Sequence, residues 1–90
     1  MNILITGSKG FIAKNLIISL KSQNFNIFEH HKKSSIKTLN SKINKSDLII
    51  HLAASNRPKK QSEFNEVNFK FTKLLCKFVE DSNKSIPIIF

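Results

Sequence analysis

The chain begins MNILITGSKGFIAKNLIISL (residues 1–20), and this segment predicts the architecture of the rest of the chain. Residues 3–5, Ile-Leu-Ile, form an apolar run that is too short for a helix and rich in β-branched side chains, so they predict a buried strand. Residues 6–10 have the composition of a turn. Apolar residues then recur at i, i+3, i+4 and i+7, which is one face of an α-helix, at Ala13, Leu16, Ile17 and Leu20. The segment therefore predicts a strand, a glycine turn and a helix.

The only two glycines of the chain, Gly7 and Gly10, both lie in this turn. Gly7 can adopt a backbone conformation closed to other residues, and it has no side chain to block a ligand. Gly10 lies at the predicted start of the helix, where free N–H groups and the helix dipole favour an anion. The pattern G-x-x-G-x-x-A, which ends at the small residue Ala13, is typical of a Rossmann-type dinucleotide site. The alternative is a plain strand–helix turn whose glycines serve geometry alone.

Two motifs resemble the extended short-chain dehydrogenase/reductases, the family of nucleotide-sugar epimerases, dehydratases and reductases. They are ILITGSKGFIA at residues 3–13 and DLIIHLAA at residues 47–54. Residues 9–11 and 56–58 further resemble reductases of capsular polysaccharide biosynthesis. Family members are much longer, so the resemblance implies that residues 1–90 are the N-terminal part of an NAD(P)-binding Rossmann domain.

The resemblance also implies which residues contact the cofactor. The glycine turn would hold the pyrophosphate, and the small residues after the strand at 48–52 would let the cofactor approach. Asn68 stands where family members carry an Asn that helps hold the active-site geometry, although an exposed polar helix residue is the alternative. The contacts expected on this basis come from Gly7, Ser8, Lys9, Gly10, Phe11, Ile12, Leu52, Ala53, Ala54 and Asn68.

The end of the second predicted strand, at residues 25–29, favours NADP over NAD. An acidic residue there binds the 2′-hydroxyl of NAD, whereas a basic residue accommodates the 2′-phosphate of NADP. On the family pattern, His31 stands where the NAD-selecting Asp is usual, and Lys32 and Lys33 follow. Glu29 would lie inside the strand and point elsewhere. NAD remains the alternative cofactor, since these lysines also fit a plain loop of a lysine-rich chain.

No catalytic residue is assigned. In the family, a Ser or Thr after the fourth strand and a later Tyr-x-x-x-Lys motif carry the reaction, and this chain has no tyrosine. We therefore expect no turnover from these ninety residues alone, and a non-catalytic cofactor-binding fragment is an alternative function. His51 is interpreted as a hydrogen-bonded core histidine. A complete family member would take a nucleotide sugar, and a homodimer is left open.

Composition limits the other functions. Ninety residues form one small domain of marginal stability. The formal charge is +9, but the lysines are spread along the chain without a nucleic-acid recognition motif, so a nucleic-acid partner is the least favoured interpretation.

The single cysteine, Cys76, excludes an internal disulfide and is expected to be buried. The three histidines lack metal-ligand spacing, so no metal is expected.

The remaining segments predict a parallel α/β sheet. Helices are predicted at residues 10–22, 36–45 and 63–81, and strands at 3–5, 25–29, 48–52 and 85–90. Alternation of strands and helices favours a parallel sheet, and right-handed crossovers suggest the strand order 3-2-1-4. Met1 leads directly into a strand and no apolar run approaches membrane-spanning length, so a cytoplasmic protein without a membrane partner is expected.

Overall fold

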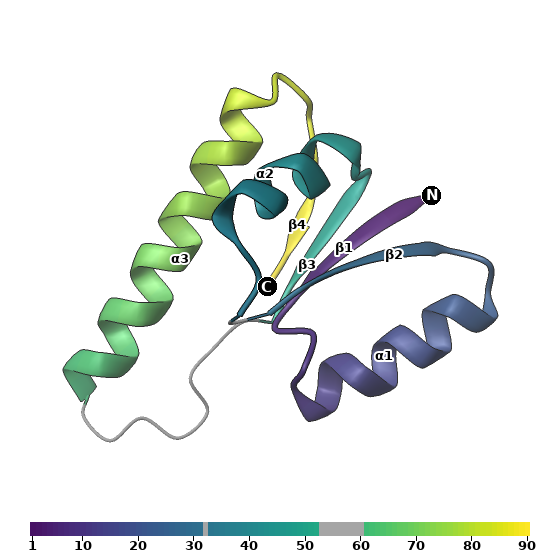
Figure 1. Ribbon diagram of the computed structural model, residues 1–90, viewed down its shortest axis with the longest axis horizontal. Helices are drawn as coiled ribbons and strands as arrows, with labels where there is room; N and C mark the ends of the chain where they lie inside the picture. Colours follow the sequence, from purple (N-terminus) through teal and green to yellow (C-terminus); the bar gives the residue numbers. More distant parts are fainter. Residues whose placement is uncertain (32, 53–60) are drawn as a thin grey trace.

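A computed structural model of the chain describes residues 1–31, 33–52 and 61–90, with side chains described outside residues 61–69. Strands and helices alternate along these residues (Figure 1). Their order is β1 (Asn2–Thr6), α1 (Phe11–Ser22), β2 (Asn26–His30), α2 (Ile36–Lys45), β3 (Leu48–His51), α3 (Gln61–Asp81) and β4 (Ile88–Ile89). The predicted α/β class is confirmed, and the predicted bounds hold closely except for β4, which is shorter than residues 85–90.

The four strands are parallel and form one sheet in the order β2-β1-β3-β4. The predicted parallel sheet is confirmed, but the order 3-2-1-4 is corrected, because β3 pairs with β1 and not with the outer edge of β2. Two hydrogen bonds join the start of β1 to the residue before β3: Asn2 N–H donates to the Asp47 carboxylate at 2.8 Å, and Asp47 N–H donates to the Asn2 carbonyl at 2.8 Å. β1 lies between β2 and β3, and its apolar residues are buried on both faces of the sheet.

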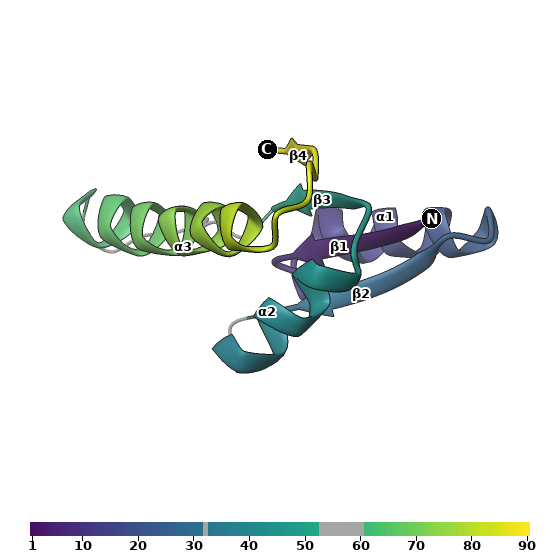
Figure 2. The same cartoon turned by 90° about the horizontal axis from the view of Figure 1, so that it is seen from above.

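The helices lie on both faces of the sheet, α1 on one and α2 and α3 on the other (Figure 2). Right-handed crossovers require this arrangement, because the chain moves from β1 to β2 in one direction and from β2 across β1 to β3 in the other. On the α2–α3 face, the buried residues are Leu4, Leu39, Ile43, Ile49, Leu75 and Ile86; on the α1 face they are Ile3, Ile5, Ala13 and Ile17. The strand order reverses between β1 and β3, and ligands of open α/β sheets bind at the carboxyl ends of such a strand pair.

Local signals explain the ends of the helices. Ser35 caps the start of α2, where its hydroxyl accepts a hydrogen bond from Thr38 N–H at 3.1 Å. The Lys84 ammonium donates to the Asn44 and Ser46 carbonyls at 2.8 and 3.2 Å, which satisfies carbonyl acceptors at the C-terminal end of α2.

None of the helices in the described ranges has the length and hydropathy that crossing a bilayer requires.

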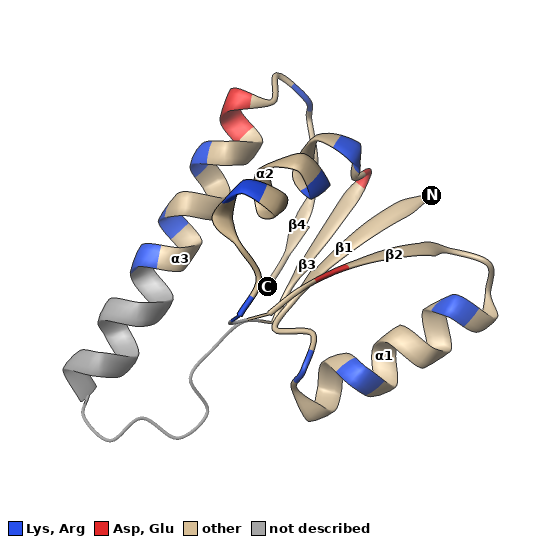
Figure 3. Ribbon diagram, viewed as in Figure 1, with Lys and Arg blue, Asp and Glu red and all other residues tan. Residues whose placement is uncertain are grey.

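Cys76 is exposed, so the prediction that it is buried is wrong. It lies off the stripe of α3 that packs on the core, which is formed by Phe71, Leu75, Phe78 and Val79. The lysines are spread over α1, α2, α3 and the glycine turn, as the sequence predicts (Figure 3).

Candidate functional site

The glycine turn connects the carboxyl end of β1 to the first turn of α1. Gly7 has φ 69°, a left-handed conformation that favours glycine. Gly10 N–H donates to the Gly7 carbonyl at 3.0 Å, and a Cβ added to Gly10 would lie 3.3 Å from the same oxygen. Gly10 is also the N-cap of α1 and provides no side-chain cap. The first N–H groups of α1 therefore remain available to an anion at the point where the strand order reverses.

The two residues after the turn are apolar and yet exposed. Phe11 is 83% and Ile12 is 71% accessible at the start of α1. Neither residue belongs to the two core clusters. Contact of these two side chains with a cofactor stays a prediction.

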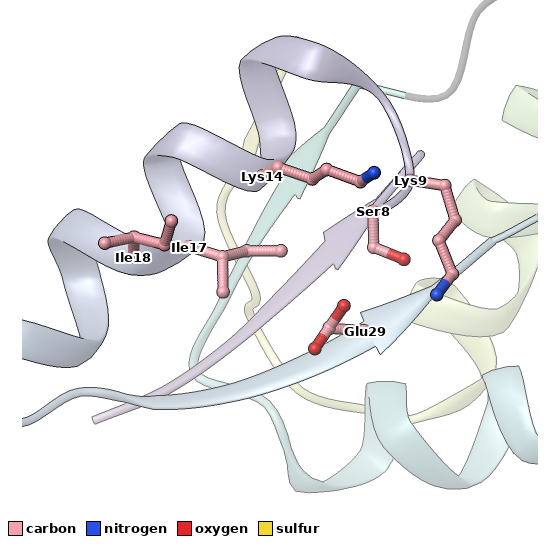
Figure 4. A pocket seen from close by; sticks show the side chains of 6 residues that line it. All are labelled: Ser8, Lys9, Lys14, Ile17, Ile18 and Glu29. Atoms are coloured by element: carbon pink, nitrogen blue, oxygen red, sulfur yellow. The ribbon is translucent and has the colours of Figure 1, made fainter.

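A hollow of about 260 Å³ opens beside the turn on the α1 face of the sheet (Figure 4). Its lining residues come from the turn, α1 and β2, and they are Ser8, Lys9, Lys14, Ile17, Ile18 and Glu29. The expectation that Glu29 points elsewhere is wrong. Glu29 pairs with Ile5 in the sheet register, and alternation along the strand directs both side chains to the α1 face. The carboxylate therefore faces the same space as Ser8 and Lys9.

The end of β2 lies against the glycine turn, since Ser8 N–H donates to the His30 carbonyl at 3.2 Å. His31 follows directly. Its N–H donates to Ser34 Oγ at 3.2 Å, and its Nδ1 accepts from Lys33 N–H at 3.3 Å. The loop thus folds back on itself beside the turn, with Lys33 exposed. Lys32 lies outside the described residues.

The end of β3 is held next to the end of β1. Leu52 N–H lies 3.1 Å from Thr6 Oγ1 and 3.3 Å from the Thr6 carbonyl, and it donates to both. Leu52 is therefore brought to the edge of the sheet that carries the glycine turn, as expected from the sequence. Ala53 and Ala54 lie outside the described residues, and so does the side chain of Asn68.

His51 is a buried, hydrogen-bonded residue, as predicted. Its Nδ1 lies 2.7 Å from Thr6 Oγ1, and its Nε2 lies 3.0 Å from Thr72 Oγ1. Its ring stacks on Phe71, with ring centroids 5.3 Å apart and an interplanar angle of 6°. The His51 side chain therefore links β3, on which it lies, to β1 and α3.

Among the described residues, no cluster of His, Cys, Asp and Glu could hold a metal ion.

His30 is a buried residue that the sequence did not reveal. It is 3% exposed, its Nδ1 has no hydrogen-bond partner among the described residues, and its ring lies 5.4 Å from Phe71. Its register partner Thr6 is also buried, and alternation along β2 points His30 away from the α1 face. Burial lowers the pKa of His30, and the positive charges of Lys42 and His31 lower it further. Burial also lowers the pKa of His51.

These two histidines are expected to make the protein less stable in mild acid. A histidine whose pKa is lower in the folded state takes up its proton first in the unfolded state. The free energy of unfolding should therefore fall as the pH drops below about 6.5, by at most about 1.4 kcal/mol per pH unit for each histidine. Urea unfolding followed by circular dichroism between about pH 7.5 and 5 measures this. His30→Phe should reduce the slope, and a stability independent of pH in this window would contradict the expectation.

Three comparisons with known proteins bear on the site. No family model matches the chain. The chain is 34% identical over 91 residues to UDP-2-acetamido-2,6-beta-L-arabino-hexul-4-ose reductase of Pseudomonas aeruginosa, covering 100% of the chain and 24% of the reductase. It therefore spans about a quarter of the length of this curated relative.

Solved structures show the same fold. The capsular polysaccharide assembling protein CapF of Staphylococcus aureus superposes with a TM-score of 0.80 at 37% identity, covering 100% of the chain and 25% of that protein. A short-chain dehydrogenase/reductase superfamily protein of Agrobacterium tumefaciens with bound NAD superposes with a TM-score of 0.77 at 18% identity, covering 98% of the chain and 32% of that protein. The second likeness shows the fold alone. The chain thus corresponds to the N-terminal, Rossmann-type region of extended short-chain dehydrogenase/reductases of the epimerase/dehydratase family, as its motifs predict.

Proposed function

We propose that this chain is the dinucleotide-binding part of a nucleotide-sugar reductase, epimerase or dehydratase, and that it binds NADP(H). The observation that carries the proposal is the glycine turn, which combines a left-handed Gly7, an N-cap Gly10 without a side chain, and a place at the reversal of strand order. The donor groups there fit a pyrophosphate, and glycine at position 10 avoids a Cβ that would lie only 3.3 Å from the Gly7 carbonyl oxygen.

The relatives support a nucleotide-sugar setting. The curated relative is named for a UDP-linked sugar, and CapF is named for capsular polysaccharide assembly. When bound, the nicotinamide cofactor supplies hydride chemistry at a sugar carbon. The residues of this chain bind and orient the cofactor, and catalytic groups are not assigned to them. A non-catalytic binding role is the second candidate, favoured by the absence of tyrosine from the ninety residues.

The choice of NADP rests on charge at the end of β2. On the family pattern, His31 stands where an acidic residue would select NAD, and Lys33 follows in the same loop. Lys9 adds a positive charge from the glycine turn. A 2′-phosphate is stabilised by such surroundings, whereas a carboxylate at position 31 would repel it.

Titration of the chain with both cofactors tests this proposal. The chain contains no Trp and no Tyr, so binding is best followed by isothermal calorimetry or by NADPH fluorescence. We expect NADP⁺ to bind about tenfold more tightly than NAD⁺, the effect of one charge-assisted contact. Tighter binding of NAD⁺ would contradict the cofactor choice, and binding of neither would contradict the proposed function.

A further inference from the structure

β2 lies at one end of the sheet, and β1 is its only strand neighbour in the part of the chain that the structure describes (Figure 1). The Asn26 N–H donates to the first carbonyl of the chain at 3.1 Å, and the His30 carbonyl accepts from an N–H of the glycine turn at 3.2 Å. Asn26 and His30 therefore turn these backbone groups toward β1. Because alternate residues of a parallel strand bond to the same neighbour, Ile27 and Glu29 turn theirs to the free edge.

The side chain of Lys42 covers part of this free edge. Lys42 belongs to α2, and its partly buried ammonium donates to the Glu29 carbonyl. An open strand edge can pair with another chain, and a lysine placed on the edge is one of the means by which proteins prevent this. Lys42 thus occupies an acceptor that an added strand would need.

The imidazole of His30 follows this contact directly along β2, on the face of the sheet that α2 and α3 cover. The residue is 3% exposed, and its Nδ1 has no hydrogen-bond partner among the described residues. The side chains that face this region come from every element packed against it, and they are Thr6, His31, Lys42, His51 and Phe71. Both ring nitrogens of His51 lie within hydrogen-bond distance of threonine hydroxyls. No carboxylate is among these side chains, so a proton on His30 would bring an unbalanced positive charge.

The charges of His30 and Lys42 oppose each other. Burial lowers the pKa of His30, and the positive charges of Lys42 and His31 lower it further. Such an interaction is mutual, so a protonated His30 makes the position of the Lys42 ammonium equally unfavourable. Lysine has a long, flexible side chain and a strongly hydrated ammonium, so water offers it another partner. Protonation of His30 is therefore expected to displace Lys42 from the Glu29 carbonyl.

Without Lys42, the free edge of β2 is complementary to itself. In an antiparallel pair of β2 strands centred on Phe28, Ile27 of each copy lies opposite Glu29 of the other, and these residues exchange both backbone hydrogen bonds. The two half-buried Phe28 side chains then meet at the two-fold axis as a cross-strand aromatic pair. No like charges lie directly opposite each other in this register. A second copy of the chain is therefore the partner that this edge fits.

We propose that Lys42 and His30 form a pH-sensitive latch on the free edge of β2. Lys42 keeps a second copy of the chain from pairing there near neutral pH, and protonation of His30 releases Lys42 and opens the edge. This inference is independent of the proposed function, because no cofactor takes part in it. It gives a role to the buried ring of His30, which the proposed function does not use.

Sedimentation equilibrium of the full chain, without cofactor, tests the latch at about pH 7.5 and about pH 5.5, on either side of the usual histidine pKa. We expect the unmodified chain to self-associate about tenfold more tightly at the lower pH. Lys42→Met should associate as tightly at the higher pH as the unmodified chain does at the lower one, because the latch is absent. Lys37→Met, on the exposed side of the same helix, is the matched control and should change nothing.

Two further variants test the trigger and the surface. His30→Phe removes the titrating ring and keeps Lys42, so its self-association should not respond to pH. Ile27→Pro should abolish the acid-induced association, because its missing N–H faces the free edge and no hydrogen bond to β1 is lost. Circular dichroism checks that each variant folds. Hydrogen exchange of the unmodified chain needs no substitution, and the Ile27 and Glu29 amides should exchange more slowly when the chain associates.

Three results would overturn the inference. The first is a self-association of the unmodified chain that is the same at both pH values, or a Lys42→Met variant that associates no more than Lys37→Met. The second is acid-induced association that leaves the exchange of the Ile27 and Glu29 amides unchanged, which would place the contact on another surface. The third is an unchanged pH response in His30→Phe. Failure of the chain to bind a dinucleotide would contradict the proposed function and leave the latch standing.

Discussion

Gly10→Asp is expected to abolish dinucleotide binding while the chain stays folded. Gly10 has φ −72° and ψ 159°, which is the extended conformation of an N-cap residue, and Asp is a favoured N-cap. Its carboxylate would accept from the free N–H groups at the start of α1, which a bound pyrophosphate would otherwise use, and it would add negative charge there. We expect a loss of affinity of about a hundredfold or more, equivalent to about 2.7 kcal/mol.

Gly10→Ala separates crowding from charge in this experiment. Its Cβ would lie 3.3 Å from the Gly7 carbonyl oxygen, so it tests the space alone. We expect a smaller loss of affinity than for Gly10→Asp, measured by calorimetry with NADP⁺, and circular dichroism checks that both variants fold. Affinity of the Asp variant within about threefold of the unmodified chain would show that the pyrophosphate lies elsewhere.

The turn and its flanking elements could be predicted because they are contiguous in the sequence. The strand at β1, the left-handed Gly7 and the apolar face of α1 follow from local conformational preferences and from the period of the side chains. Ser8 is different. Its buried, unpaired hydroxyl depends on how α1 and β2 close over the turn, and no local pattern indicates that.

The pairing of β3 could not be predicted in the same way. Its apolar run predicts a strand that helices cover on both faces, and that description fits a strand beside β2 as well as a strand beside β1. The position of β3 beside β1 goes with contacts between residues that are distant in the sequence. Asp47 contacts Asn2, and the apolar face of α2 packs with Leu4 and Ile49.

The direction of the Glu29 side chain also depends on contacts between distant residues. A shift of one residue along β2 would turn its side chain to the other face, and only the register with Ile5 fixes its direction.

Leu4→Ala is expected to have the largest effect on stability. Leu4 is fully buried in the central strand and belongs to the core cluster that α2 and α3 cover. Replacing such a leucine leaves a cavity and costs about 3–5 kcal/mol. A ninety-residue domain has a total stability of about 5–13 kcal/mol, so the variant should lose a large share of it.

Ile18→Ala is the matched control for this cavity, because it also shortens an aliphatic side chain. Ile18 is 70% exposed on α1, so its replacement should change the free energy of unfolding by no more than about 0.5 kcal/mol. Urea unfolding followed by circular dichroism measures both variants against the unmodified chain. Equal effects would mean that Leu4 is not enclosed by α2 and α3. A large loss for Leu4 alone would support the arrangement in which α2 crosses β1, because that crossing brings Leu39 and Ile43 into the cluster that encloses Leu4.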